Sequence, residues 1–412
     1  MRILLVNKFL FPRGGAETAV FQQAELLREA GHDVAFFSMA HPENIDTEWA
    51  EYFLPRVELS GDLKPRSPIA RLRAAARIIY SVEAKRKIAA LVDDFHPDVA
   101  ICHNIYHHIS PTIVPVLRSK GVRTLLFLHD SKLVCPNYYL LTRGHTCERC
   151  LGGHYLNCVR LRCVGGSFVE SVLCATELWL HRRLRLYRQA DAIICPSRFL
   201  GNKLKEDGFY ASMPILHIPN ASTRRLADLP PGEGRYALYV GRLEKHKGSE
   251  VLVRAAALSP DTPVVIVGDG PDEAECRRLA QDLGARNVRF AGRLPRDEVD
   301  VLYRDAACLV LSSVCYENCP YVVIEAACYG KPSIVSNIGG MAELVDDGVT
   351  GLHFQAGDAQ DLAEKLRALM SDDQLRATTG SNARAKGERE WTTERYTERL
   401  LQACRGEYEG LL

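Results

Sequence analysis

The chain of 412 residues has no apolar run close to the roughly 18 residues that a membrane-spanning helix needs. Its start, MRILLVNKFL, is too short for a signal peptide and has no small-residue cleavage site, so it predicts a buried strand. Repeats of solenoid period and low-complexity tracts are also absent. We therefore expect a cytoplasmic globular protein, and the length predicts at least two domains.

The chain has almost no excess of positive or negative charge, since its net charge is only +1. The two kinds of charge are nevertheless unevenly distributed along it. Residues 1–219 carry 28 Lys and Arg against 21 Asp and Glu, whereas the remainder carries 24 against 30. The basic excess concentrates in Lys64–Lys87 and His181–Arg188, which have few interleaved aromatics, so nucleic acid is not an expected partner. Two explanations stay open: solvated helix faces, or contact with the anionic inner face of a membrane.

Short apolar runs alternate with amphipathic helix patterns along nearly the whole chain, which predicts an α/β protein with parallel sheets. A break at Ala221–Tyr236 carries Pro230-Pro231 and reads as a linker. We therefore expect two Rossmann-like, doubly wound domains at 1–220 and 221–390, facing each other across a cleft, and a C-terminal helix at 391–412. Residues 130–167 break the rhythm and are read as an insert in the first domain.

The segment from Glu317 to Gly351 is the most informative part of the chain. Glu317 and Glu325 stand eight apart, and Pro320 is placed like the first residue of a helix. Free N–H groups from Tyr321 onward would then face an anion, while the carboxylates accept hydrogen bonds from hydroxyls. This combination suits a sugar nucleotide. An ordinary helix with two solvated glutamates is the alternative.

Two further loops follow predicted strands and carry phosphate-binding residue types. Gly14 and Gly15, in PRGGAE, would let the backbone approach a phosphate closely at a helix start, although tight turns also need glycine. Arg242 and Lys247, in GRLEKHKG, follow the first strand of the second domain. Cations on a surface loop are usually solvated charges. Because these two lie just after a strand, where ligands bind, their position favours contact with a departing diphosphate.

Together these segments resemble glycosyltransferase family 4, whose members are retaining enzymes of the GT-B architecture. The resemblance implies that Glu325 binds the donor ribose and Glu317 the sugar hydroxyls near the anomeric carbon. It places Arg242 and Lys247 on the diphosphate, which makes a catalytic metal unnecessary. It also implies that His129, at the end of the strand RTLLFLH, contacts the transferred sugar.

The same resemblance implies a larger set of donor contacts and a C-terminal helix that crosses back to the first domain. The implied donor-binding residues are Gly14, Gly15, Gly268, Gly270, Arg293, Leu294, Asn318, Tyr321 and Val322. One departure stands out: many members have Gly-Phe-Gly or a similar run after the first glutamate, where this chain has Asn-Cys-Pro. That difference leaves the identity of the sugar open.

We therefore expect a retaining, metal-independent glycosyltransferase that uses a UDP- or GDP-linked sugar. Its expected acceptor is a glycan or a lipid-linked glycan, in the assembly of cell-surface polysaccharide or glycolipid. A sugar-nucleotide epimerase would need no acceptor surface, and no lysine suits the pyridoxal phosphate of a phosphorylase. A catalytically silent sugar-nucleotide-binding scaffold would not need the full set of two cations and two glutamates.

The insert carries a cysteine pattern that does not belong to this chemistry. Cys147, Cys150, Cys158 and Cys163 lie within 17 residues, one pair at CxxC spacing, with Cys135 nearby. Four thiolates suit a tetrahedral structural zinc site, which would leave no open position for catalysis. Reduced unliganded cysteines, an iron–sulfur cluster and a regulatory disulfide remain the alternatives.

Overall fold

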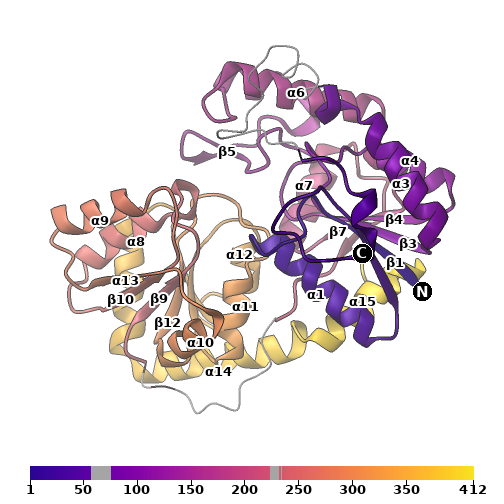
Figure 1. The fold of residues 1–412 in the computed structure, drawn as a ribbon. Coiled ribbons are helices and arrows are strands. Elements are labelled where there is room, and N and C mark those ends of the chain that lie inside the picture. The colour runs from indigo at the N-terminus through magenta and orange to yellow at the C-terminus, as the bar shows by residue number, and fades with distance from the viewer. Residues whose placement is uncertain (57–75, 223–231, 233) are drawn as a thin grey trace. The chain divides into compact units, whose positions relative to one another are not determined.

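The computed structural model describes residues 1–56, 76–222, 232 and 234–412, so most of the predicted linker and the first part of the basic run from Lys64 lie outside it (Figure 1). The chain forms two compact units. The first comprises Met1–Tyr139, Glu148–Ile218 and Thr397–Leu412. The second comprises Leu140–Cys147 and Pro219–Tyr396.

The first unit is built on a six-stranded, fully parallel sheet in the order β2-β1-β3-β4-β7-β8. Its strands are β1 (Arg2–Val6), β2 (Asp33–Phe37), β3 (Val99–Cys102), β4 (Arg123–Phe127), β7 (Ala192–Cys195) and β8 (Ile215–His217). Almost every strand residue is buried, as expected for a parallel sheet covered by helices. The strand order reverses between β1 and β3, and ligands of such sheets bind beyond the carboxyl ends at that point.

Three helices of the first unit begin at serine caps that the sequence supplies. The side chains of Ser81, Ser167 and Ser197 each accept a backbone N–H in the first turn of the helix that follows. The helices are α1 (Gly15–Glu29), η1 (Glu48–Tyr52), α3 (Val82–Phe95), α4 (Ile113–Ser119), η2 (Leu151–Gly153), α5 (Leu156–Leu161), α6 (Phe168–Arg183), η3 (Tyr187–Gln189) and α7 (Arg198–Asp207).

The region predicted as an insert contains the short antiparallel pair β5 (Leu141–Thr142) and β6 (His145–Thr146), together with η2 and α5. Its small core is formed by Cys150, Tyr155 and Cys158, which pack with Ala175 and Leu178 of α6. The segment from Leu140 to Cys147, which holds the strand pair, groups with the second unit.

The second unit repeats the parallel architecture with the order β11-β10-β9-β12-β13-β14. Its strands are β9 (Ala237–Val240), β10 (Val264–Val267), β11 (Val288–Gly292), β12 (Cys308–Leu311), β13 (Ser333–Ser336) and β14 (Gly351–Phe354). Its helices are η4 (Lys245–Lys247), α8 (Ser249–Ala257), α9 (Glu273–Asp282), α10 (Arg296–Asp305), α11 (Tyr321–Cys328), α12 (Gly339–Leu344), α13 (Ala359–Ser371) and α14 (Asp373–Glu390). The helix α15 (Thr393–Arg405) begins in this unit and continues into the first.

Two hydrophobic clusters cover opposite faces of this second sheet. Tyr239 points into a cluster with Leu252 and Leu366, whereas its neighbour Leu238 points into another with Ile324. Successive residues of a strand therefore pack against helices on opposite faces of the sheet. The strand order reverses between β9 and β12, so a ligand is expected beyond the ends of these two strands.

The α/β fold with two Rossmann-like parallel sheets, predicted from the sequence, is confirmed. Within the described residues, no helix is long and apolar enough to cross a membrane. The chain passes from the second unit into the first within α15, because residues from Thr397 onward belong to the first unit. There, Arg123 Nη1 donates to the carbonyl of Cys404 at 2.8 Å, and the Leu411 carbonyl accepts the His217 N–H at 2.6 Å.

Candidate active site

An ion pair occupies the reversal point of the second sheet. Lys247 follows β9 and Glu317 follows β12; the Lys247 Nζ lies 2.6 Å from the Glu317 Oε1. The Ser313 hydroxyl donates to the same oxygen at 2.7 Å. Within the described residues, the other carboxylate oxygen, Oε2, accepts no hydrogen bond. One oxygen is therefore held in place, and the second is available to a hydroxyl.

Charge and burial act against each other in this pair. Burial alone would raise the pKa of the Glu317 carboxyl, but the Lys247 ammonium and the Ser313 hydroxyl bring it below its ordinary value. Burial would likewise lower the pKa of Lys247, but the Glu317 charge raises it above its ordinary value. Both groups are thus charged near neutral pH, and Glu317 is a weak base.

Close backbone contacts join the loops that carry these two side chains. The Val314 N–H donates to the His246 carbonyl at 2.9 Å, and the Ser312 hydroxyl donates to the Gly248 carbonyl at 2.8 Å. Gly248 has φ +66°, and a Cβ there would lie 1.8 Å from the Ser312 carbonyl oxygen. Only glycine permits this approach, so Gly248 holds the loop after β9 against the loop after β12.

Gly268 and Gly270, predicted to bind the donor, also have structural roles. A Cβ on Gly268, whose φ is +127°, would lie 1.9 Å from the Gly241 carbonyl oxygen, and one on Gly270 would lie 2.3 Å from the Leu243 carbonyl oxygen. The Gly268 N–H donates to the Gly292 carbonyl at 2.7 Å. These glycines hold together the loops that follow β9 and β10 and the end of β11, so close packing by itself explains them.

The helix α11 begins a few residues after Glu317. Its N-cap is Pro320 and its first residue is Tyr321, so it starts one residue later than predicted. The cap has no side-chain hydrogen bond. Asn318, Tyr321 and Val322 are all half-buried at this end of the helix. The first turn thus presents its backbone to the end of the sheet that carries Glu317.

Glu325 lies inside α11 and is fixed by a residue that the sequence analysis did not single out. The Tyr303 hydroxyl donates to Glu325 Oε2 at 3.0 Å, and the Tyr303 ring stacks on Tyr329 with 5.5 Å between ring centroids. Tyr303 is fully buried, so this carboxylate has a rigid support. Ser313 was missed as well; its signal was its position two residues beyond the buried strand CLVL.

The two arginines predicted to bind donor lie at strand ends of the second unit. Arg242 follows β9, is exposed, and pairs with Glu244 at 2.6 Å. His246 lies 3.3 Å from the other oxygen of Glu244. Arg293 is exposed and Leu294 half-buried, directly after β11. The loops that follow the neighbouring strands β9, β10, β11 and β12 thus all contain predicted site residues.

In the first unit, His129 follows β4 and forms a chain of ring contacts. Its Nε2 lies 2.8 Å from Nδ1 of His103, whose Nε2 lies 3.1 Å from the Gln23 side-chain oxygen. If Gln23 accepts, His103 donates to it and accepts from His129, which leaves Nδ1 of His129 as an acceptor. Burial, followed by the nearby Lys8 charge, lowers the pKa of His129 to about 3. His129 is therefore neutral at pH 7.

Gly14 and Gly15 lie at the start of α1, where Gly14 is the N-cap. Gly14 has φ −166°, an extended conformation open to any residue, and both glycines are exposed. Beside them, the buried Glu17 accepts a hydrogen bond from the Asn7 side chain at 3.3 Å. Backbone geometry does not require glycine at position 14, unlike at Gly248.

The cysteines predicted to bind zinc are only partly brought together. Cys150 and Cys158 share one buried cluster, and Cys163 packs against it. A hydrogen bond between the Cys158 and Cys163 side chains, then burial, raises the pKa of the Cys158 thiol. Cys147 belongs to the other compact unit. The four-cysteine zinc site therefore stays a prediction.

Within the described residues, one group of three His, Cys, Asp or Glu has its ligand atoms within 4.8 Å of one another: His107, Cys174 and Glu177. The Lys132 ammonium lies 2.8 Å from Glu177 Oε2, and His107 Nδ1 lies 3.1 Å from it. Lys132 and Glu177 are both buried, so a buried cation already occupies this site. The group fits an ion-pair network rather than a metal.

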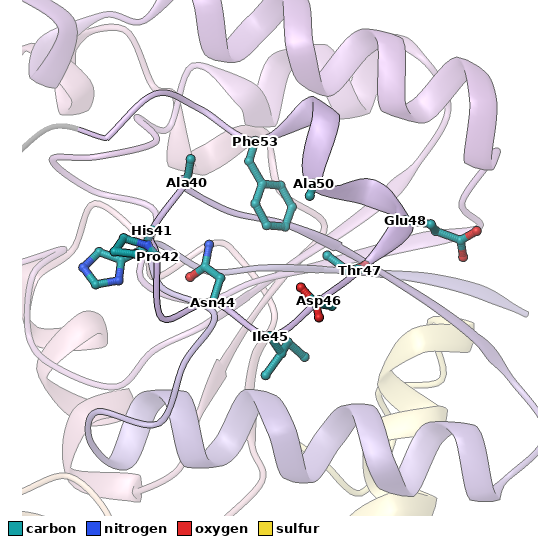
Figure 2. Close-up of a pocket in the computed structure, with 10 residues that line it drawn as sticks. All are labelled: Ala40, His41, Pro42, Asn44, Ile45, Asp46, Thr47, Glu48, Ala50 and Phe53. Carbon is teal, nitrogen blue, oxygen red and sulfur yellow. The ribbon is translucent and has the colours of Figure 1, made fainter.

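A separate pocket of about 540 Å³ opens after β2 in the first unit (Figure 2). His41, Asn44 and Thr47 contribute polar atoms, and Phe53 forms an apolar wall. The His41 ring stacks on Phe11 at 4.4 Å between centroids. None of the site residues predicted from the sequence lines this pocket.

Glycosyltransferase family models match both halves of the chain. The family model described as "Glycosyltransferase Family 4" matches residues 13–221, half of the chain. The chain belongs to glycosyltransferase family 4. A second model, "Glycosyl transferases group 1", matches residues 224–386 of this glycosyltransferase. The enzyme class and the GT-B fold, both predicted above, are thereby confirmed.

Two curated relatives match over most of this family 4 chain, and a third matches about half of it. It is 27% identical to the phosphatidyl-myo-inositol mannosyltransferase of Mycolicibacterium smegmatis, over 92% of this chain and 86% of that protein. It is 26% identical to an uncharacterised protein in the cps region of Klebsiella pneumoniae, over 84% and 87%. A D-rhamnosyltransferase of Pseudomonas aeruginosa is 34% identical over 49% of this chain and 50% of its own.

Solved structures share the fold of the glycosyltransferase at low identity. Sucrose-phosphate synthase from Thermosynechococcus elongatus superposes with a TM-score of 0.74 at 22% identity, covering 98% of each chain. Anabaena HepE in complex with UDP gives a TM-score of 0.68 at 18% identity, covering 98% of this chain and all of that one.

Proposed function

We propose that this glycosyltransferase is a retaining, metal-independent enzyme that takes a sugar from a UDP- or GDP-linked donor. The observation that carries the proposal is the Lys247–Glu317 pair at the reversal point of the second sheet, with Ser313 fixing one carboxylate oxygen. A cation for phosphate and a carboxylate for sugar hydroxyls stand side by side, where a donor needs both.

Each group has a defined task in this proposal. Lys247 and Arg242 neutralise the charge that develops on the leaving diphosphate, and no divalent cation is required for that. The uncapped first turn of α11, at Tyr321 and Val322, adds N–H groups and a favourable dipole. Glu325, supported by Tyr303, accepts hydrogen bonds from the ribose. Gly14, where the backbone does not require glycine, suits close approach of a phosphate.

The state of the ionisable groups supports a front-side, retaining transfer. The bond between the anomeric carbon and the diphosphate oxygen breaks, and the acceptor oxygen bonds to the same face of that carbon. Glu317 has a lowered pKa and His129 is neutral, so neither is a strong base. The acceptor proton therefore goes to the departing phosphate oxygen. His129 orients the sugar through hydrogen bonding.

The relatives suggest the acceptor class. A mannosyltransferase named for phosphatidyl-myo-inositol, a D-rhamnosyltransferase and a protein from a cps region all resemble the chain. We propose a glycan or lipid-linked glycan as acceptor, in the assembly of cell-surface polysaccharide or glycolipid on the cytoplasmic side of the membrane.

The cysteine cluster is proposed to hold one structural zinc, which would fix the short segments around Cys150, Cys158 and Cys163. Cys147 or Cys135 would supply the fourth thiolate. The Cys135 thiol donates to the Asn137 side-chain oxygen at 2.8 Å, and Asn137 donates to the Cys163 carbonyl at 3.5 Å. Elemental analysis of the purified chain should give about one zinc per chain. No metal, with cysteines that are freely alkylated in the folded protein, would reject the site.

Nucleotide binding tests the donor assignment. We expect UDP or GDP, and one of their sugars, to raise the melting temperature, with the shift unchanged by EDTA. NMR of the product should show the anomeric configuration of the donor. An inverted product would reject retention, and a shift abolished by EDTA and restored by magnesium would reject metal independence. No shift with any nucleotide would reject the donor assignment.

A further inference from the structure

One face of α6 is apolar and open to solvent. Phe168, Val169, Val172 and Trp179 are exposed by 56%, 73%, 37% and 54% of their surface. On a helical wheel these positions and Arg183 fall within one arc of about 100°. We call these five residues the α6 face. The helix is labelled in Figure 1.

The opposite side of α6 already provides its anchorage. Ala175 and Leu178 pack into the small core with Tyr155 and Cys158. Glu177, fully buried, pairs with Lys132, and Ser167 caps the helix. The fold therefore does not need the α6 face for its own stability. A helix that is apolar on both sides normally has its second side covered by something.

Further exposed apolar side chains lie on segments that contact α6. Leu156 belongs to α5, which packs on α6, and Leu184 directly follows the helix. Tyr80 and Val82 are exposed just after Ile79, whose carbonyl lies 2.7 Å from Nε2 of His181 near the end of α6. Eight of the fourteen exposed large hydrophobic residues of the described chain thus lie on α6 or on segments beside it. The other six are scattered, so this patch is exceptional.

The charges near the patch are almost all positive, which favours an anionic partner. From residue 156 to 188 the chain carries six arginines and only two glutamates, one of which is the buried Glu177. Arg160, Arg162, Arg183 and Arg185 are exposed, and within the described residues no carboxylate lies within 4.0 Å of any of them. An apolar stripe with an aromatic residue at each end and free guanidinium groups around it fits the boundary between lipid headgroups and acyl chains.

We propose that the α6 face docks on an anionic lipid bilayer. Phe168, Val169, Val172 and Trp179 enter the headgroup boundary, while Arg183, with the arginines beside it, contacts lipid phosphates. The surface differs from the basic run at Lys64–Lys87 and does not depend on donor chemistry. It would hold the first unit at the membrane, where a lipid-linked acceptor resides.

Vesicle sedimentation with the full chain tests the surface. We expect binding to phosphatidylcholine vesicles with about 30 mol% phosphatidylglycerol, weak binding to pure phosphatidylcholine, and loss of binding in high salt. The double variant Phe168→Ser/Trp179→Ser should bind at least about tenfold more weakly. The matched control Leu258→Ser/Leu283→Ser, two exposed leucines of the second unit, should bind as the wild type does.

The arginine contribution is tested separately. Arg183→Ala/Arg185→Ala should remove most of the preference for anionic vesicles, whereas Arg278→Ala/Arg286→Ala, two exposed arginines of the second unit, should not. Tryptophan emission should shift to shorter wavelength on vesicle addition and should not shift in Trp179→Phe.

Two outcomes would overturn the proposal. Unchanged vesicle binding of Phe168→Ser/Trp179→Ser would move the membrane contact elsewhere. A dimer in light scattering that this variant converts to monomer, without vesicle binding by the wild type, would make the α6 face a contact between two copies of the chain. Nucleotide binding is measured in parallel, so failure of the donor assignment is distinguished from failure of docking.

Discussion

Single side chains of the site are each held by a neighbouring side chain. Lys247 keeps Glu317 charged, Tyr303 holds Glu325, and His103 holds His129. Burial acts to lower the pKa of Lys247, but the charge and hydrogen bond of Glu317, together with other nearby groups, raise it overall. Burial and the Lys8 charge instead lower the pKa of His129, which stays neutral. These partners lie between 22 and 70 residues away in the sequence, and the sequence analysis did not single out Tyr303 or His103.

Loss of Lys247 should disable catalysis without unfolding the protein. Lys247→Ala removes the ammonium nearest Glu317, and we expect turnover to fall by about 10²–10³-fold. The unfolding free energy should fall by at most about 3 kcal/mol, since the pair is partly solvated. Lys245→Ala, an exposed position in the same turn, is the control. Turnover near that of the wild type in Lys247→Ala would place the diphosphate elsewhere.

The neutral His129 should make the protein sensitive to acid. Unfolded histidine binds a proton below pH 6.5, whereas burial and Lys8 hold the pKa of folded His129 near 3. The unfolded state thus binds more protons between these values, so stability is full above pH 6.5 and falls as the pH drops. In His129→Gln the slope of unfolding free energy against pH should be shallower by up to about 1.4 kcal/mol per pH unit.

Urea unfolding at several pH values between 7 and 4 measures that slope. The exposed His145→Gln serves as the control and should keep the slope of the wild type. Identical slopes for His129→Gln and the wild type would mean that folding does not lower the pKa of His129.

Loops at the ends of parallel strands position the site, and glycine is what brings them together. Gly248 joins the loop after β9 to the loop after β12, and Gly268 joins the loops after β9 and β10 and the end of β11. The sequence suggested that glycines 268 and 270 contact the donor. The structure gives them a reason that spacing does not reveal, because it depends on which strands are neighbours.

The contact of Gly248 can be separated from its backbone conformation. Gly284 has nearly the same φ, +64° against +66°, but a Cβ there would meet nothing within 4 Å. We expect Gly284→Ala to cost about 1 kcal/mol of stability and Gly248→Ala at least about 3 kcal/mol, with weaker donor binding. Chemical unfolding and nucleotide titration measure both. Equal costs would show that the Ser312 contact relaxes freely.

Whole-molecule architecture was accessible from the sequence because alternating apolar strands and amphipathic helices leave little choice. Glu317, Lys247 and Ser313 meet because β9 and β12 are neighbours. The family resemblance placed the first two residues at the donor but did not indicate Ser313. The environment of the cysteines was not accessible in the same way. CxxC spacing does not reveal that Cys150 and Cys158 pack on α6 or that Cys147 groups with the other unit.

The end of the chain should contribute to the stability of the first unit. Leu400 of α15 is fully buried, whereas Leu412 is mostly exposed. We expect Leu400→Ala to lower the unfolding free energy by about 2–4 kcal/mol and Leu412→Ala by less than about 0.5 kcal/mol. Hydrogen exchange should show the loss in strands of the first unit, such as β4. Loss confined to the second unit would contradict this assignment.

The return of α15 into the first unit has a consequence for how the enzyme is made. During synthesis the parts of the first unit up to Ile218 are mostly made before the second unit, whereas Thr397–Leu412 follow it. The unit that begins to form first is therefore the last to be completed, after the second unit has been synthesised in full. A chain that stops before Thr397 would therefore lack part of the first unit while holding the whole of the second.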